Sequence, residues 1–309
     1  MRKPISSLVL VLVPFAGSGA LELSIDPGSS VVGTTQVITA KYEDTFVKLA
    51  RQYNLGFEEL KQANPDVDPW LPGEGTQIVL PTQFVLPSAP RQGVVINLPE
   101  LRLYYYPEND PGRVITHPVS IGRMEWQTPL GRAQIVAKAE KPAWYPPESI
   151  RAEHAADGRP LPRVVPPGPD NPLGDYAMRL SIPGYLIHGT NKPSGLGMRV
   201  THGCIRMFPE DIEGLFGIVP IGTPVHIVNQ PFKLAWSANG YYLEAHPPLE
   251  EENVDGAWAM TQLTRAFVAA TEEGQGSSFD WGLAELAVEK LRGVPEFVSL
   301  VSVADRTPD

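Results

Sequence analysis

Cysteine is almost absent from this chain, which has a single thiol, Cys204, among its 309 residues. One cysteine cannot form an internal disulfide, so the composition excludes a disulfide-stapled scaffold. A lone free thiol is a chemical liability in oxidising surroundings, and its presence favours a use for it. The alternative, a buried and inert cysteine that packs as a small apolar residue, stays open at this point.

Basic residues are also scarce. The 25 lysines and arginines face 35 acidic residues, which gives a formal net charge of −10. A negatively charged protein repels nucleic acids and other polyanions, so we expect no nucleic-acid partner.

Long hydrophobic runs are missing except near the start of the chain, where Ser6 to Gly17 is mostly apolar behind a basic start. This stretch contains Pro14 and is shorter than the roughly 20 residues that a membrane-spanning helix needs. A basic start, a short apolar stretch and small residues ending at Ala20 are typical of a secretory signal peptide. We therefore predict that residues 1–20 are cleaved off on export and that no stable membrane insertion remains. A retained anchor or a buried helix is the alternative.

Proline, in contrast, is abundant, with 33 residues, and 42% of the chain is hydrophobic. The length and the apolar content suffice for one large domain with a real core and a smaller domain beside it. Frequent prolines favour turns and edge strands over a helical bundle.

Residues 37–81 have the pattern of a small α+β module, in the order strand, helix, helix, strand. We expect Asp44 to cap the first helix, and the second helix to span Phe57–Ala63 and end at Asn64. The ANP sequence at 63–65 and the LPG-to-IVLP ending resemble a LysM module, a fold that lies along the sugar chains of cell-wall glycan. A small packing domain without a ligand is the alternative.

Residues 91–230 follow a proline-spaced connector and contain short apolar or alternating runs separated by Pro, Gly and Asn. Such runs predict a mainly β domain that resembles a sandwich or barrel. The proline-rich segment 144–174 is expected to be irregular and to cross one face as a binding loop. The predicted strands are 94–98, 101–106, 114–122, 133–139, 176–182, 185–188 and 224–228.

Residues 231–309 change in character, with helical spacing at 261–272 and 281–292 and one further strand at 241–245. We expect Gly293 to end the last helix. No chemistry is evident here, and a helical appendage packed on the large domain is the simplest interpretation.

Cys204 needs a base or a cation beside it, because a thiol with its ordinary pKa of about 8.5 is mostly un-ionised at neutral pH. His202 is two residues away and would share a face with Cys204 on a strand, lying alongside the sulfur. His188 ends the YLIH strand and can face the sulfur from a neighbouring strand. A backbone oxygen such as the Gly189 carbonyl could hold the other nitrogen of that imidazole.

The residues around Cys204 suit acyl transfer through a thioester. Gly203 permits a close turn, and backbone N–H groups of Gly203 and Cys204 could stabilise an oxyanion. Arg206 presents a planar fork of donors that suits a substrate carboxylate.

The run from His188-Gly189-Thr190 to Thr201-His202-Gly203-Cys204-Ile205-Arg206 resembles the signature of the YkuD-type L,D-transpeptidase catalytic domain. The family pattern is a histidine and, further on, Ser or Thr before His-Gly-Cys, an aliphatic residue and Arg or Asn; Thr201 stands for the commoner serine. The layout, with a signal peptide and a LysM-like module, is similar to the periplasmic ErfK/YbiS/YcfS/YnhG group. Further matches are VVIN (94–97), LRLYYYP (101–107), PVSIG (118–122), TPLG (128–131) and GPDNPLG (168–174).

The resemblance implies a role for each motif residue. Cys204 would be the nucleophile and His188 the general acid and base, oriented by the Gly189 carbonyl. His202 and Gly203 would shape the oxyanion site. Arg206 and Thr201 would bind substrate, without any cofactor or metal.

The resemblance also implies a periplasmic enzyme that acts on peptidoglycan tetrapeptide stems and releases D-Ala. The acyl acceptor would be the lysine of an outer-membrane lipoprotein or the amine of a second stem, giving a 3→3 cross-link. A hydrolase with water as acceptor and a non-catalytic wall-binding protein are the alternatives.

The remaining histidines, 117, 154, 226 and 246, show no partner pattern and are expected at the surface or satisfied within strands. A zinc site built from His188, His202 and Cys204 is disfavoured, because a His-x-Cys pair is not a common zinc spacing.

Overall fold

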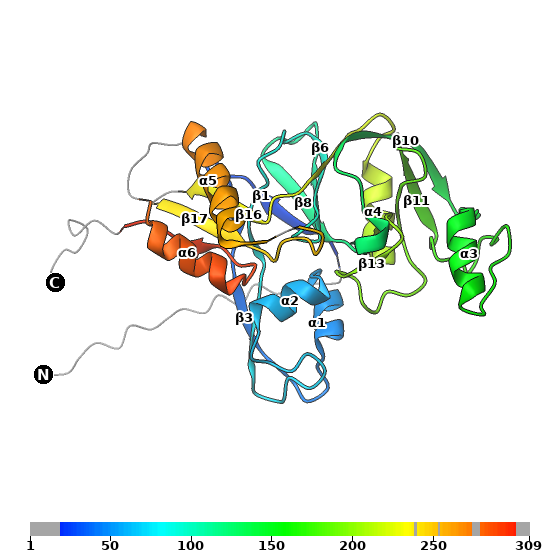
Figure 1. The fold of residues 1–309 in the computed structure, drawn as a ribbon, viewed down its shortest axis with the longest axis horizontal. Helices are drawn as coiled ribbons and strands as arrows, with labels where there is room; N and C mark the ends of the chain where they lie inside the picture. Colours follow the sequence, from blue (N-terminus) through cyan, green and yellow to red (C-terminus); the bar gives the residue numbers. More distant parts are fainter. Residues whose placement is uncertain (1–18, 238–239, 253, 274–278, 301–309) are drawn as a thin grey trace, which may run out of the picture.

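The computed structural model describes residues 19–237, 240–252, 254–273 and 279–300 (Figure 1). Most of the predicted signal peptide lies outside these residues. Strand β1 (Leu21–Ser24) begins one residue after the predicted cleavage point at Ala20. Within the described ranges, no helix combines the length and apolar character needed to cross a membrane.

The centre of the protein is one nine-stranded sheet with the order β1-β8-β7-β6-β15-β10-β11-β12-β14. The register of the long strand β10 shifts between Ile135 and Ala137, and such irregularities bend a strand, so the sheet curls here. The mainly β prediction is confirmed. The strands are β6 (Gly93–Asn97), β7 (Arg102–Tyr106), β8 (Arg113–Pro118), β10 (Gly131–Glu140), β11 (Tyr176–Leu180), β12 (Leu186–His188), β14 (Ile205–Arg206) and β15 (Pro224–Val228).

Strands β6 and β7 are buried on both faces and divide the interior into two cores. Val94 and Tyr105 point into the core beneath helix α4 (Pro209–Ile218). Val95 and Tyr104 point the opposite way, into a second core shared with the small helices near the N-terminus. The tyrosines of β7 are therefore packing residues on alternating faces, as their period of two predicts.

The small module (residues 36–80) has the predicted order: β3 (Gln36–Thr39), α1 (Phe46–Tyr53), α2 (Phe57–Ala63) and β4 (Gln77–Leu80). Helix α1 is capped by Thr45, whose hydroxyl accepts from Lys48 N, and not by Asp44. The Asp44 carboxylate instead accepts from Lys41 N in the preceding turn. In Figure 1 the module lies against the large sheet, and its helices share the second core.

The connector after the small module contains a strand that was not predicted. Strand β5 (Gln83–Val85) pairs with β2 (Val31–Gly33), because three residues without proline suffice for a short pairing. The segment 144–174 likewise contains a helix, α3 (Glu148–Ala156), where irregular chain was expected. Its sequence ESIRAEHAA is a proline-free run between flanking prolines, long enough for two helical turns.

The C-terminal part contains more β structure than predicted. Helices α5 (Gly256–Glu273) and α6 (Trp281–Lys290) pack on a sheet of β16 (Phe232–Ser237), β17 (Gly240–Ala245) and β18 (Glu296–Phe297). Helix α6 ends with Leu291 in the left-handed region (φ 48°) and not at Gly293.

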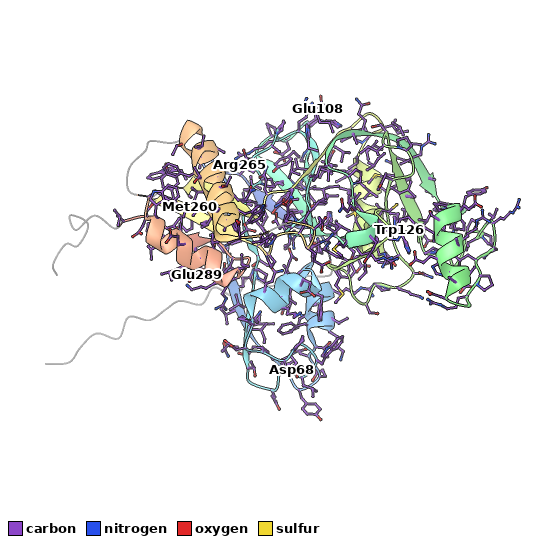
Figure 2. The ribbon with its side chains drawn as sticks, in the orientation of Figure 1. Asp68, Glu108, Trp126, Met260, Arg265 and Glu289 are labelled. Carbon is purple, nitrogen blue, oxygen red and sulfur yellow. The ribbon has the colours of Figure 1, made fainter. Side chains whose placement is uncertain are left out.

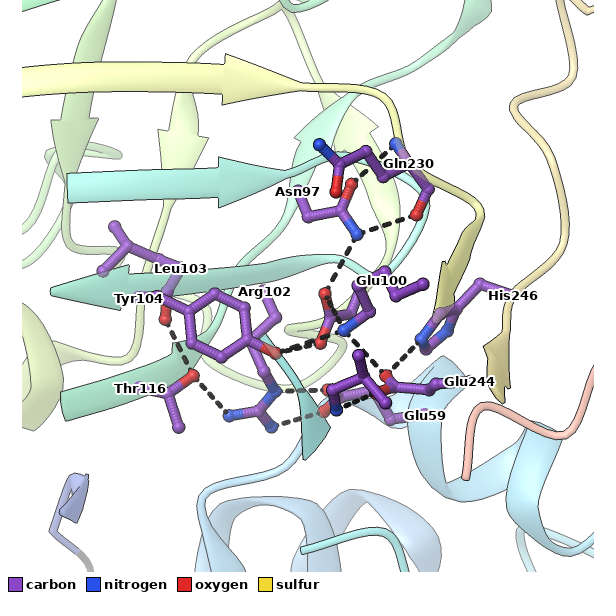
Figure 3. Close-up of polar contacts among 12 residues, drawn as sticks. Glu59, Asn97, Glu100, Arg102, Leu103, Tyr104, Thr116, Gln230, Glu244 and His246 are labelled. Atoms are coloured by element: carbon purple, nitrogen blue, oxygen red, sulfur yellow. Dashed lines mark hydrogen bonds and ion pairs between the residues drawn. The ribbon is translucent and has the colours of Figure 1, made fainter. Parts of the chain in front are cut away.

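A buried ionic cluster joins this C-terminal part to β7 (Figure 3). Lys233 Nζ lies 2.7 Å from Glu100 Oε2 and 2.9 Å from Glu244 Oε1, and His246 Nε2 lies 2.6 Å from Glu244 Oε1. Buried charges are tolerated when they are paired, and here the Lys233 ammonium supplies the positive charge between two carboxylates. His246 is thus deeply buried and bonded, and the C-terminal part carries charged chemistry that its sequence pattern did not reveal.

Candidate active site

His188 and Cys204 are brought together by two neighbouring parallel strands. Strand β12 pairs with β14, with Ile187 opposite Ile205 and His188 opposite Arg206. Cys204 directly precedes β14, so this register places it opposite Leu186, two residues before His188 on the neighbouring strand. The Leu186 backbone and the Arg206 charge both act on the Cys204 thiol. The strand that ends at His188 is thus a neighbour of the strand that follows Cys204, as the sequence predicts, and the role of His188 as the base stays a prediction.

The His188 imidazole is fixed by its own neighbour. Its Nδ1 lies 2.6 Å from the Gly189 carbonyl oxygen, which can only accept, so Nδ1 carries the proton and Nε2 is left as a base. Burial and the Arg206 charge lower the pKa of His188 to about 4, against the opposing effect of the Gly189 and Leu173 carbonyls. The imidazole is therefore neutral at physiological pH and able to accept a proton.

The Cys204 thiol is partly exposed, and its Sγ lies 3.7 Å from the Gly184 carbonyl oxygen. Burial raises the pKa of this thiol, while a backbone hydrogen bond from Leu186 and the Arg206 charge lower it in part. At rest the thiol and the His188 imidazole are thus both neutral. Such a pair forms a nucleophile only when the base takes the proton during attack.

The turn that carries Cys204 is shaped by Gly203 and Thr201. Gly203 has φ +98°, and a Cβ there would lie 2.8 Å from Tyr185 Cε1. The Thr201 hydroxyl donates to Cys204 O at 2.6 Å and accepts from Gly203 N at 3.2 Å. The Thr201 hydroxyl is thus used inside the turn, and the substrate-binding role expected for this residue stays a prediction. The Gly203 N–H already donates to the Thr201 hydroxyl. Of the two N–H groups expected to stabilise an oxyanion, the Cys204 N–H is therefore the one left to do so.

His202 does not share a strand face with Cys204, contrary to the sequence-based expectation. Residues 202–204 lie between β13 (Arg199–Thr201) and β14, and the positive φ of Gly203 breaks the alternation. Strand β13 pairs instead with the short strand β9 (Ile121–Gly122).

The His202 ring is held by residues that sequence reasoning missed. The His202 Nε2 lies 3.0 Å from Glu153 Oε2 on α3. Trp126, labelled in Figure 2, belongs to the 3₁₀ turn η1 (Met124–Trp126). Its ring meets the His202 ring edge-on, with 5.1 Å between the centroids. Arg123 donates to the other Glu153 oxygen. Burial lowers the pKa of His202, and Glu153 opposes that shift. No local motif connects Glu153 with His202, so only the fold of the 144–174 segment reveals the contact.

Arg206 is a largely buried cation beside the thiol. Its backbone exchanges two hydrogen bonds of 2.9 Å with Ser120, which fixes the start of the side chain. Burial lowers the pKa of the guanidinium, and its Nε has no hydrogen-bond partner among the described residues. A buried donor left unpaired is costly, and an anionic ligand would satisfy it.

The comparisons with known proteins identify the family of this chain. The model of a family described as "L,D-transpeptidase catalytic domain" matches residues 91–227. In Escherichia coli (strain K12), "Probable L,D-transpeptidase YcfS" is 45% identical, covering 73% of this chain and 72% of that protein. "Probable L,D-transpeptidase YbiS" from the same strain is 39% identical, covering 87% of this chain and 88% of that protein.

Solved structures show a weaker similarity. L,D-transpeptidase 3 from Mycobacterium tuberculosis is 19% identical, covering 70% of this chain and 97% of that chain, with a TM-score of 0.34. A TM-score this low supports no conclusion about function. The assignment of the family therefore rests on the sequence matches. The two E. coli relatives match most of the chain, and the chain therefore belongs to the L,D-transpeptidase family and is an enzyme of that family.

Proposed function

We propose that Cys204 is the nucleophile of a peptidoglycan L,D-transpeptidase and that His188 is its general acid and base. The observation that carries this assignment is the neutral His188 imidazole, held through Nδ1 by the Gly189 carbonyl on the strand next to the one that follows Cys204. A base of this kind can take the thiol proton as the sulfur attacks a carbonyl carbon.

The donor substrate is a tetrapeptide stem of peptidoglycan. As the Cys204 sulfur bonds to the carbonyl carbon of the third residue, the thiol proton moves to His188 Nε2. The proton then passes to the departing nitrogen, D-Ala leaves, and a thioester remains. The Cys204 N–H stabilises the oxyanion, and His202, held by Glu153, forms a wall of the same site.

The thioester is resolved by an amine. His188 takes a proton from the attacking amine, the new amide bond forms, and the Cys204 thiolate leaves and is reprotonated. A water molecule in place of the amine would give the hydrolase reaction, and both outcomes use the same protein groups. The acceptor is the lysine of a lipoprotein or the side-chain amine of a second stem.

Transfer to an amine is expected to dominate when an acceptor is present. A tetrapeptide-bearing muropeptide incubated with excess lysine-ended lipoprotein peptide should give a conjugate lighter than the sum of its parts by one D-Ala, measured by mass spectrometry. The same donor without the peptide tests stem-to-stem transfer. Only free D-Ala and tripeptide in both reactions would instead assign the protein as a hydrolase.

Arg206 is proposed to bind a carboxylate of the donor stem, because its Nε is buried and unpaired among the described residues. Lysine cannot reproduce the bidentate geometry of a guanidinium. Arg206→Lys is therefore expected to lower kcat/KM by about 10-fold or more, mainly through KM. The matched control is Arg179→Lys on β11, where the arginine is exposed and should tolerate the exchange. Equal kinetics for the two variants would remove Arg206 from substrate binding.

We propose that the protein acts in the periplasm after cleavage near Ala20, and that the small module holds it on glycan. The ANP and IVLP segments support this role, and so do Tyr42 and Trp70, which are 84% and 60% exposed. Exposed aromatic side chains favour contact surfaces, since they combine a large apolar body with a polar atom. A wall-binding protein without activity fits less well, because the Cys204–His188 arrangement is intact.

A further inference from the structure

The small module touches the segment that joins the two proposed catalytic residues. Phe57 N donates to Leu196 O at 3.0 Å, and Glu58 N donates to Gly197 O at 3.3 Å. The first N–H groups of a helix have no partner within it, and those of α2 find theirs in this segment (residues 189–201). We call this contact between the start of α2 and residues 196–197 the seam. An open groove of about 620 Å³ lies beside it, between α1 residues such as Lys48 and the segment residues Pro193 and Ser194.

Two glycines allow the backbones to meet. A Cβ on Gly197 would lie 2.3 Å from Gly56 Cα and 2.8 Å from Phe57 N, so any side chain there would push the small module away. A Cβ on Gly56 would lie 3.0 Å from Gly197 Cα. The seam is thus a direct contact between two backbones. A displacement of the small module there would move the segment 189–201 directly, because no long side chain lies between them to adjust its conformation.

Ser120 connects this contact to the site. Gly197 N donates to Ser120 Oγ at 3.1 Å and Met198 N at 3.3 Å, while the Ser120 backbone exchanges its two hydrogen bonds with Arg206. Strand β13 then pairs with β9, so that Thr201 lies opposite Gly122 immediately before the Cys204 turn. A shift at Gly197 therefore reaches Arg206 and the Cys204 turn through short, continuous contacts.

The start of α2 is in turn fixed to the large sheet. Glu59 accepts from Gly56 N and from Arg102 Nε and Nη2, the latter two at 2.6 and 2.8 Å (Figure 3). Arg102 is fully buried, and it also donates to Thr116 Oγ1 and Asn54 O. Breaking the buried Glu59–Arg102 pair would be strongly destabilising. The pair therefore fixes the position of Gly56 relative to the sheet.

A second fixed point lies on α4. Asn54 Nδ2 donates to Asp211 Oδ1 at 2.6 Å, and Arg51 Nε lies 2.8 Å from Glu210 Oε1. Helix α4 begins three residues after Arg206, so both sides of the Cys204–Arg206 segment are held by the small module.

We propose that the small module is a component of the catalytic unit, and that Gly56 and Gly197 are positioning residues that set the place of the segment 189–201. This inference rests on the proposed roles of Cys204, His188 and Arg206, and it is independent of glycan binding. Removing the small module would therefore lower activity on soluble muropeptides as well as on intact sacculi, because the segment loses its support. Deletion cannot separate positioning from wall targeting, whereas single substitutions in the seam can.

The decisive comparison is Gly197→Ala against Gly195→Ala. Both glycines have positive φ, +78° and +99°, so both substitutions add backbone strain to the same segment. A Cβ at Gly195 would meet only Met198 Sδ, at 3.5 Å, an ordinary contact. Gly197→Ala is expected to lower kcat/KM on a soluble muropeptide by about 10- to 100-fold relative to Gly195→Ala, as for a misplacement of about 1 Å.

The pH profile of Cys204 alkylation distinguishes positioning from a loss of stability. Because the Arg206 charge lowers the pKa of this thiol, moving Arg206 away should shift alkylation of Gly197→Ala to higher pH. Binding to sacculi should be unchanged. Gly56 has an ordinary φ of −84°. Gly56→Ala should therefore show a smaller fall in kcat/KM and a smaller shift of alkylation. If Gly197→Ala does not fold, this variant tests the positioning role in its place.

Equal kcat/KM and alkylation profiles for Gly197→Ala, Gly56→Ala and Gly195→Ala would overturn the positioning role. A failure of the proposed function gives a different result. In that case Cys204→Ala, which lacks the thiol, would remain active, independently of the variants in the seam.

Discussion

Cys204→Ala is expected to abolish both the release of D-Ala and the formation of any conjugate, with a loss on the order of 10⁴-fold or more. No second thiol exists in the chain to replace it. The side chain is partly exposed, so its truncation leaves little cavity and folding should be retained. Product masses on a tetrapeptide-bearing muropeptide measure the loss, and circular dichroism checks the fold.

Cys204→Ser is the stricter version of this test. A hydroxyl is far harder to ionise than a thiol, and a neutral His188 with its pKa near 4 is too weak a base to compensate. We expect this variant to be nearly inactive although its shape is preserved. The wild-type enzyme mixed with donor alone should show an adduct of the acyl group on Cys204, which neither variant forms. Activity in the alanine variant would rule out the covalent mechanism.

His188→Ala is expected to slow acylation by about 10²- to 10⁴-fold, the usual effect of losing general acid–base catalysis. The lowered pKa of His188, about 4, sets the pH dependence of the wild type. The base is neutral above that value and is protonated as the pH falls through it. We therefore expect kcat/KM to hold down to about pH 5 and to fall below about pH 4.

The alkylation of Cys204 identifies which histidine acts as base. Burial raises the pKa of the thiol, so alkylation of the wild type should increase on the alkaline side. His188→Ala should move alkylation to still higher pH, because the thiol then loses the base that takes its proton during attack. His226→Ala, on strand β15, is the matched control and should leave the profile unchanged. A shift seen in His202→Ala and absent from His188→Ala would reverse the two assignments.

The parts of the site that could be predicted from the sequence are those that lie within one short run. The order of His202, Gly203, Cys204 and Arg206 follows directly from the chain, and His188 could be placed because it ends a short strand close in sequence. The same holds for the strands of the large sheet, where apolar runs bounded by turn residues are a local signal.

The parts that could not be predicted depend on contacts between distant residues. Glu153 reaches His202 only because α3 folds over the site, and its run between prolines gave no sign of a partner. The buried pair of Glu59 and Arg102 joins two separately predicted regions, so neither residue is informative alone. At shorter range, Thr45 displaced Asp44 as the helix cap, since both are good capping residues and their spacing does not discriminate between them.

The contact between Gly56 and Gly197 limits how this enzyme can be recombined. A foreign module fused to the large domain, or this module moved to another enzyme, would have to present an unsubstituted backbone at both points of contact. Most residue pairs would hold the two chains apart. The small module and the large domain therefore have to be exchanged together. A redesign meant to change the proposed wall binding should alter the exposed surface of the small module around Tyr42 and Trp70, and leave the contact at Gly56 unchanged.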